Sequence, residues 1–285
     1  MTEPVIEVVD LRKTYRDGFE ALRGIDLDIR RGETFALLGP NGAGKSTTIE
    51  ILEGYRSRTS GGIRVLGVDP ARGGGAWKAR LGIVLQETGE SPTATVRQLL
   101  RHVAGFYPHP RDVDGLIEAV GLSAKASTSV RRLSGGQRRR VDVALGIVGR
   151  PDLLFLDEPT TGFDPEVRRQ FWDLIRELQS EGTTIVLTTH YLDEAAALSE
   201  RAAIVVAGRI AARGPIGELG GQDARTPIVR WREGGIRREE RAERPGELVA
   251  RLVGASATEP EDLEVIRPSL EDVYLDLLAR ETAAA

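Results

Sequence analysis

The sequence predicts an α/β fold with a mixed, mainly parallel sheet, helices on its faces and a small α+β unit towards the C-terminus. An apolar run at residues 35–38 leads through a glycine-rich segment into a helical pattern at residues 47–55. A second run, at residues 153–156, is wholly apolar, which suits a strand at the centre of a sheet that is covered on both faces. After Gly220 the pattern changes to short strand-like segments, which predicts a separate unit.

Composition and charge narrow the class of protein. With 285 residues, 40% of them hydrophobic, the chain can bury one large core and a small additional unit. It has no cysteine, which excludes disulfides and thiolate metal sites, and its formal charge of −4 argues against a nucleic-acid binder. No apolar run approaches the ~18 residues of a membrane span, and residues 1–10 lack the features of a secretory signal. We therefore expect an intracellular protein with no nucleic-acid partner.

The glycine-rich segment has the pattern of a loop that holds the phosphates of a nucleoside triphosphate. Gly39 and Gly44 flank four residues and are followed by Lys45 and Ser46, where a predicted strand turns into a predicted helix. Backbone N–H groups can close on phosphates where no Cβ intervenes, Lys45 supplies a cation and Ser46 supplies a hydroxyl for Mg²⁺. The residues assigned to nucleotide binding are Gly39, Pro40, Asn41, Gly42, Ala43, Gly44, Lys45, Ser46 and Thr47. A glycine-rich turn that only caps a helix is the alternative.

The apolar run at residues 153–156 ends in two acids, Asp157 and Glu158. In an open parallel sheet, the carboxyl ends of the strands form the edge where ligands bind. Adjacent side chains on a strand point in different directions, so the two acids can have different roles. We expect Asp157 to hold Mg²⁺ and Glu158 to polarise a water molecule as general base, which favours hydrolysis of the nucleotide over binding alone.

A third motif, Leu133-Ser134-Gly135-Gly136-Gln137, lies before this acidic pair and opens a helical pattern. It resembles the signature sequence of ATP-binding cassette (ABC) ATPases. The resemblance implies that Ser134, Gly135, Gly136 and Gln137 contact the γ-phosphate held by a second copy of the cassette, so that ATP joins a homodimer. The same residues also fit a Ser-x-x-Gln capping box, which starts many helices, and the two interpretations are compatible.

Four further positions match marks of the ABC family. The resemblance implies that Tyr15 stacks on adenine, that Gln86 reaches Mg²⁺ and contributes to catalysis, and that His190 senses the γ-phosphate. It places Asp164 in the dimer-contact loop, where Phe163 replaces the leucine of most members. From local sequence alone, a surface tyrosine at a strand end explains Tyr15 equally well.

The resemblance covers residues 6–214 and implies a P-loop NTPase core of the ABC-ATPase type. We expect a nucleotide-binding domain at residues 1–220, with a helical subdomain inserted at about residues 90–150. Apolar residues recur at intervals of three and four at residues 94–121, which is typical of amphipathic helices.

The remaining residues, 221–285, are expected to form a small α+β accessory domain. Short strands are predicted at residues 226–231 and 236–242, and a helix at residues 247–253. Ser269 and Asp272 fit a capping box for the final helix. The resemblance implies that this domain braces the dimer, and a plain domain-closing helix is the alternative.

Two segments, at residues 188–194 and 268–274, are similar to those of daunorubicin-type drug exporter ATPases. The resemblance implies an ATP-hydrolysing subunit of a bacterial exporter, which uses ATP and Mg²⁺ at the cytoplasmic face of the membrane. Its partners would be a second copy of the cassette and a membrane permease that selects a drug-like or other cargo. One alternative is an ATP-gated switch that acts on ribosomes or DNA. A second is a small-molecule kinase, which leaves the signature sequence and His190 unexplained.

Overall fold

The computed structural model describes residues 4–85, 93–255 and 260–284 of the 285-residue chain, and Gln86 lies outside them. Contacts divide the chain into two compact units, Met1–Ile210 and Ala211–Ala285. The division lies inside strand β9 (Arg209–Pro215), before the boundary that the sequence predicts between residues 220 and 221. Among the described residues, no helix is long and apolar enough to span a membrane.

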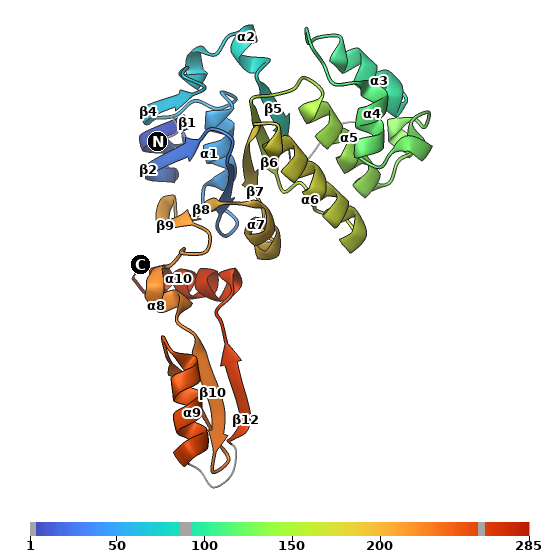
Figure 1. The fold of residues 1–285 in the computed structure, drawn as a ribbon. Helices are drawn as coiled ribbons and strands as arrows, with labels where there is room; N and C mark the ends of the chain where they lie inside the picture. Colours follow the sequence, from blue (N-terminus) through green and yellow to red (C-terminus); the bar gives the residue numbers. More distant parts are fainter. Residues whose placement is uncertain (1–3, 86–92, 256–259, 285) are drawn as a thin grey trace. The chain divides into compact units, whose positions relative to one another are not determined.

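A six-stranded sheet forms the centre of the first unit (Figure 1). Besides β9, its strands are β3 (Thr34–Leu38), β5 (Leu81–Val84), β6 (Leu153–Asp157), β7 (Thr184–Thr188) and β8 (Arg201–Val206). The strand order is β5-β6-β7-β3-β8-β9, and the pairs from β5 to β8 are parallel. The predicted α/β class is therefore confirmed, and the carboxyl ends of β5, β6, β7, β3 and β8 meet at one edge of the sheet.

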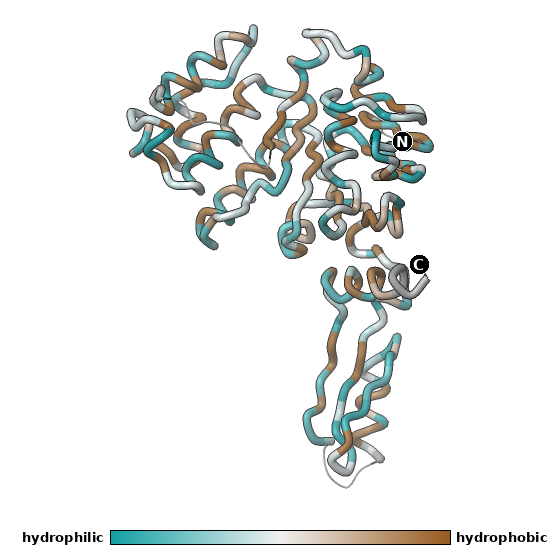
Figure 2. Tube along the Cα trace, turned by 180° about the vertical axis from the view of Figure 1, so that it is seen from behind, coloured by the Kyte–Doolittle hydropathy of each residue, from teal (hydrophilic) through white to brown (hydrophobic). Residues whose placement is uncertain are grey.

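A smaller antiparallel sheet packs into the same core. It consists of β1 (Pro4–Thr14), β2 (Glu20–Arg30) and β4 (Ser60–Val65), in the order β2-β1-β4. In β2, buried Ile25, Leu27 and Ile29 alternate with less buried residues, which is the period of a strand with one covered face. These side chains join a core that also contains Phe35 and Phe155, and Figure 2 shows apolar residues concentrated along the strands.

Helices surround the main sheet and form a subdomain beside it. The longer helices are α1 (Lys45–Leu52), α3 (Val96–Ala104), α4 (Val113–Ala119), α5 (Gly135–Ile147), α6 (Pro165–Ser180) and α7 (Leu192–Leu198). The described residues of this unit also contain a short helix α2 (Gly75–Lys78) and three 3₁₀ turns. Helices α3 and α4 lie within residues 94–121, so the helical pattern predicted there is confirmed. Figure 1 shows these two helices grouped with α5.

The second unit combines a sheet with helices, as the sequence predicts. Its elements are α8 (Gly221–Arg225), β10 (Ile228–Glu233), β11 (Ile236–Arg241), α9 (Pro245–Ala255), β12 (Glu261–Ile266) and α10 (Leu270–Ala284). The sheet is antiparallel with the order β11-β10-β12, and Val229 and Leu248 are buried within the unit. The capping box of α10 is confirmed, because the Ser269 and Asp272 side chains each accept a hydrogen bond from the other residue's backbone N–H.

Candidate nucleotide site

The glycine loop connects the end of β3 to the start of α1, as predicted. Two of its glycines have backbone conformations that side chains do not tolerate, with φ of 150° at Gly39 and 109° at Gly44. A Cβ on Gly39 would lie 2.2 Å from the carbonyl oxygen of Val205, and one on Gly44 would lie 2.8 Å from that of Ala21. The close approach of β2 and β8 therefore requires glycine here, and it leaves the loop amides free of side-chain cover.

A cavity of about 680 Å³ opens at this loop. It brings together ten of the predicted site residues: Tyr15, Asn41, Gly42, Gly44, Lys45, Ser46, Thr47, Asp157, Glu158 and His190. The other predicted residues of the loop, Gly39, Pro40 and Ala43, do not line it. The loop, the end of β6 and the segment after β7 thus meet at the carboxyl edge of the sheet, where open α/β sheets bind ligands.

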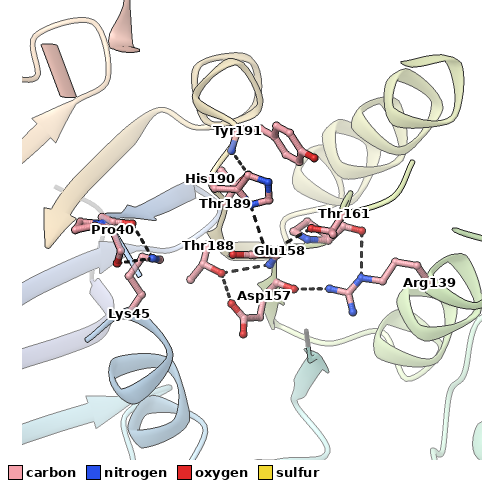
Figure 3. Close-up of polar contacts among 12 residues, drawn as sticks. Pro40, Lys45, Arg139, Asp157, Glu158, Thr161, Thr188, Thr189, His190 and Tyr191 are labelled. Atoms are coloured by element: carbon pink, nitrogen blue, oxygen red, sulfur yellow. Dashed lines mark hydrogen bonds and ion pairs between the residues drawn. The ribbon is translucent and has the colours of Figure 1, made fainter. Parts of the chain in front are cut away.

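Lys45 folds back over the loop (Figure 3). Its ammonium donates hydrogen bonds to the carbonyl oxygens of Gly39 at 2.7 Å and Pro40 at 3.1 Å. Burial lowers the pKa of this ammonium, and the negative charges of Glu158 and Asp157 oppose that shift. The loop therefore presents a partly desolvated cation whose partners are two neutral carbonyls, which a phosphate can replace.

The two acids at the end of β6 are held in different ways. Thr188 donates a hydrogen bond to Oδ1 of Asp157, and the backbone N–H of Glu158 donates to the carbonyl oxygen of Thr188 at 3.0 Å. Glu158 has a φ of 47°, in the left-handed region that non-glycine residues rarely occupy. This turn of the backbone directs the Glu158 side chain away from that of Asp157.

His190 faces Glu158 across this turn (Figure 3). Its Nδ1 lies 3.4 Å from Oε2 of Glu158, and the hydroxyl of Thr161 donates to the same oxygen at 3.4 Å. The Glu158 side chain is 14% exposed and that of His190 is 49% exposed, so the carboxylate is shielded while the imidazole borders solvent. A shielded carboxylate beside a phosphate loop can accept a proton from a water molecule.

Arg139 of α5 is a buried cation that the sequence analysis did not identify. Its guanidinium donates hydrogen bonds to the carbonyl oxygens of Leu85, Asp157 and Pro159, and Figure 3 shows the side chain reaching from α5 to the end of β6. Burial lowers the pKa of this guanidinium, and the nearby carboxylates, Asp142 first among them, oppose that shift. The signature helix is thereby tied to the ends of two strands of the main sheet.

The signature residues lie in a different cavity, of about 770 Å³. It is lined by Ser134, Gly135, Gly136, Gln137 and Asp164, among others, and it shares no lining residue with the first cavity. The predicted capping box is confirmed, because the Ser134 hydroxyl accepts from the Gln137 N–H at 3.3 Å and the Gln137 amide oxygen accepts from the Ser134 N–H at 3.1 Å. One chain therefore does not bring its own signature residues to its own phosphate loop.

Asp164 serves as the N-cap of α6. Its Oδ1 accepts hydrogen bonds from the N–H groups of Glu166 at 3.1 Å and Val167 at 2.9 Å. Phe163, the departure from the family pattern, is 7% exposed and packs edge-on against Phe171 of the same helix. The loop between β6 and α6 is thus held by local contacts while Asp164 lines the signature cavity.

Aromatic side chains form one wall of the first cavity. The Tyr15 hydroxyl and the Thr47 hydroxyl lie 3.1 Å apart in a hydrogen bond, which fixes the tyrosine beside the loop. Phe19 also lines the cavity, with its ring 6.3 Å from that of Tyr15 and nearly parallel to it. Sequence reasoning missed Phe19, although a phenylalanine four residues after a candidate adenine-stacking tyrosine was a signal that could have identified it.

The oxygen atoms at the cavity fit Mg²⁺ bound together with phosphates. Ser46 and Asp157 both line the cavity, and Thr188 engages only one carboxylate oxygen of Asp157. Mg²⁺ is commonly held by one or two protein oxygens plus substrate phosphates and water. The part of the chain that the structure describes has no group of three or more acidic or histidine side chains able to hold a metal.

Comparisons with known proteins agree with this geometry. Residues 22–161 match the family model described as "ABC transporter". The chain is 35% identical to the daunorubicin resistance ATP-binding protein DrrA3 of Streptomyces coeruleorubidus, over 97% of this chain and 96% of the relative. It is also 35% identical to the Nod factor export ATP-binding protein I of Paraburkholderia xenovorans, over 99% of each. A solved ATP-binding subunit of an ABC transporter has the same fold, with a TM-score of 0.73 and 24% identity over 96% of this chain and 99% of that one.

Proposed function

Because this chain belongs to the ABC transporter family and is an ATP-hydrolysing cassette, we propose that it powers export of a cargo through a separate membrane subunit. The two relatives are each 35% identical to this chain, and one is named for daunorubicin resistance and the other for Nod factor export. We therefore propose export as the function and do not assign the cargo, which the membrane subunit would select. The site of action is the cytoplasmic face of the membrane.

The observation that carries the proposed chemistry is the single cavity shared by Lys45, Ser46, Asp157, Glu158 and His190. Lys45 and the loop amides bind the phosphates of ATP, and Tyr15 stacks on adenine. Ser46 and Asp157 hold Mg²⁺, together with Gln86, and bound Mg²⁺ neutralises charge on the phosphates. Glu158 accepts a proton from the attacking water while His190 borders the γ-phosphate.

Two copies of the cassette are needed to complete each site in this proposal. Support comes from the separate signature cavity, in which the N-terminus of α5 presents backbone N–H groups from Gly135 and Gly136. Helix N-termini bind anions, and among the described residues the phosphate loop of the same chain lines a different cavity. We infer that the γ-phosphate on the partner's phosphate loop occupies it, so that ATP joins the two copies.

Replacement of Glu158 by glutamine tests this division of roles. The amide keeps the shape of the side chain but loses its basicity, so we expect ATP binding to persist while turnover falls at least about a hundredfold. With hydrolysis blocked, saturating Mg²⁺ and ATP should convert the variant from monomer to dimer, measured by light scattering. Glu158→Gln combined with Lys45→Ala is the control, which should stay monomeric. A monomer in both proteins would contradict the shared-site mechanism.

An apolar groove beside the nucleotide cavity is the docking site that we propose for the membrane subunit. It has a volume of about 700 Å³ and exposes Tyr55 (80%), Leu85 (50%) and Ile83 (39%). Ser46 and Asp157 line its inner end as well as the nucleotide cavity. A partner seated in this groove would thus lie next to the proposed Mg²⁺ ligands, which provides a physical route from ATP binding to the membrane subunit.

The double variant Tyr55→Ser and Leu85→Ser tests this groove. We expect it to lose co-purification with the membrane protein encoded beside its gene, from detergent-solubilised membranes, because most of the exposed apolar area is removed. Val9→Ser is the matched control, since Val9 is 63% exposed on the other sheet and outside this groove. ATP affinity should be unchanged in both. If the unaltered chain recovers ribosomes or DNA and no membrane protein, export is the wrong function.

A further inference from the structure

We propose that Tyr191, which stacks on His190, and Arg168, which stacks on Tyr191, are positioning residues that hold the imidazole of His190 against Glu158. The inference rests on the proposed role of His190 at the γ-phosphate. Neither Arg168 nor Tyr191 lines the nucleotide cavity, so both act through the histidine. Because Arg168 belongs to α6, the stack also ties the position of His190 to the helix that begins at the signature cavity.

Three contacts in series make up this stack. The guanidinium of Arg168 lies 4.3 Å from the centre of the Tyr191 ring, a distance typical of a cation–π contact. The Tyr191 ring centre lies 4.0 Å from that of His190, with 40° between the ring planes. His190 Nδ1 in turn lies 3.4 Å from Oε2 of Glu158. Figure 3 shows the Tyr191 and His190 rings beside one another above Glu158.

Arg168 is placed for stacking rather than for an ion pair. Its Nε is buried, and it has no hydrogen-bond partner among the residues that the structure describes. Arg168 is half-buried whereas the neighbouring Arg169 is exposed, so the partial burial of Arg168 follows from its place on the helix surface and is not general to this turn of α6. A guanidinium is weakly hydrated and planar, and it stacks on aromatic faces at little desolvation cost.

The backbone on both sides of His190 is fixed, which leaves ring rotation as its main freedom. The N–H of Tyr191 donates to the hydroxyl of Thr189 at 3.0 Å, and the carbonyl oxygen of Thr188 accepts from the N–H of Glu158 at 3.0 Å. The His190 side chain is nevertheless 49% exposed. A half-exposed side chain changes rotamer readily. The Tyr191 ring closes one side of that space and so restricts the imidazole to the neighbourhood of Glu158.

Helix α6 connects the stack to the signature cavity. Asp164 caps the first turn of α6 and lines the signature cavity, and Arg168 lies one turn further along. A second turn on, the indole N–H of Trp172 donates to the buried carboxylate of Glu194 in α7 at 3.2 Å. Helix α6 is therefore anchored to the segment around His190 at two points. A shift of its N-terminus on occupation of the signature cavity would reach His190 through Arg168 and Tyr191.

The test uses the full-length protein in four variants. Tyr191→Leu and Arg168→Met remove the stack, Tyr191→Phe keeps it, and Arg169→Met is the matched control on the exposed neighbour. For the first two we expect kcat for ATP to fall about tenfold while KM changes less than about twofold, because a displaced imidazole affects the reaction more than ground-state binding. Tyr191→Phe and Arg169→Met should match the unaltered protein.

A spectroscopic measurement without nucleotide separates positioning from simple loss of folding. The chain has three histidines, so the ring-proton resonances of His190 are identified by their loss in His190→Gln. The ring current of Tyr191 should shift these resonances in the unaltered protein and in Tyr191→Phe, and the shift should be lost in Tyr191→Leu. Unchanged His102 and His109 resonances would verify that the helical subdomain is intact.

The outcomes distinguish this inference from the proposed function. Full activity of His190→Gln would remove the role of His190 and this inference with it. An inactive His190→Gln together with an unchanged kcat in Tyr191→Leu and Arg168→Met would overturn the positioning role alone. An unshifted His190 resonance in Tyr191→Leu would do the same, because the rings would then not be stacked in solution.

Discussion

Glu53 is a buried carboxyl group at the C-terminal end of α1, and it lines the proposed docking groove. It is 6% exposed, and no salt bridge to it occurs among the described residues. Burial raises its pKa to about 8, and the negative charges of Asp157 and Glu50 add to the shift. The group is therefore neutral in the folded protein at neutral pH.

This carboxyl predicts a loss of stability as the pH rises. The folded-state pKa is above the unfolded value, so the stabilising contribution is complete below about pH 4.5 and is lost as the pH rises towards 8. The loss amounts to about 1.4 kcal/mol per pH unit within that window. We measure the free energy of unfolding by urea denaturation from pH 5 to 9. The difference between Glu53→Gln and the unaltered protein should shift in favour of the variant as the pH rises through the window, and it should become constant above it. An exposed control, Glu118→Gln, should differ from the unaltered protein by a constant amount.

Most of the predicted site residues that one cavity brings together belong to contiguous motifs. The glycine loop, Asp157 and Glu158 were recognisable because each motif spans a strand end and its turn. Arg139, by contrast, bonds to the carbonyl of Leu85, 54 residues away in the chain, and Thr188 bonds to Asp157 across 31 residues. Such contacts depend on the strand order and on the packing of α5, which local patterns do not encode.

Two helices of the same subdomain begin with equivalent capping boxes, and comparing the two boxes separates an effect on stability from an effect on ATP hydrolysis. Thr95 and Gln98 start α3 with the same reciprocal hydrogen bonds that Ser134 and Gln137 form at α5. Replacement of either hydroxyl residue by alanine should cost about 1 kcal/mol of stability, because one backbone N–H loses its partner. Only Ser134→Ala should also lower ATP hydrolysis, measured per folded molecule after each unfolding curve has been recorded.

One outcome of this comparison would contradict the predicted role of Ser134 in ATP hydrolysis. Equal ATP hydrolysis in Thr95→Ala and Ser134→Ala, at equal losses of stability, would leave Ser134 with the role of a helix cap alone. In that case the signature cavity would have no part in the reaction.

The sequence predicted whether a segment is a helix or a strand better than it predicted the residues at which that element begins and ends. Strand β7 stops at Thr188, two residues before His190, because the turn that follows is set by the Thr189 hydroxyl and the N–H of Tyr191. The helical pattern at residues 94–121 divides into α3 and α4, and Gly105, Pro108 and Pro110 lie in the gap. The antiparallel sheet of β1, β2 and β4 was not predicted, since the pairing of its strands contains several register shifts that local patterns do not encode.

For the whole molecule, the two separate cavities predict complementation between inactive variants. A symmetric dimer has two sites, each built from the phosphate loop of one copy and the signature of the other. When Lys45→Ala and Ser134→Arg chains are mixed, each mixed dimer has one site with both defects and one with neither. Random mixing should therefore restore about a quarter of the unaltered ATPase activity.

The matched control mixes Lys45→Ala with a chain that carries both substitutions, in which no intact site can form. Activity of the first mixture at the level of this control would mean that the cassettes do not share sites in trans. The measurement is a steady-state phosphate-release assay at equal total protein in all mixtures.

The left-handed backbone at Glu158 has a consequence for laboratory evolution of this protein. A non-glycine residue with a φ of 47° costs on the order of 1 kcal/mol or more, whereas glycine or asparagine adopts it with little strain. A library screened only for heat resistance should therefore enrich glycine or asparagine at position 158 and discard the carboxylate. Thermostable descendants obtained in that way would be inert cassettes, so screening of this fold has to reward turnover together with survival on heating.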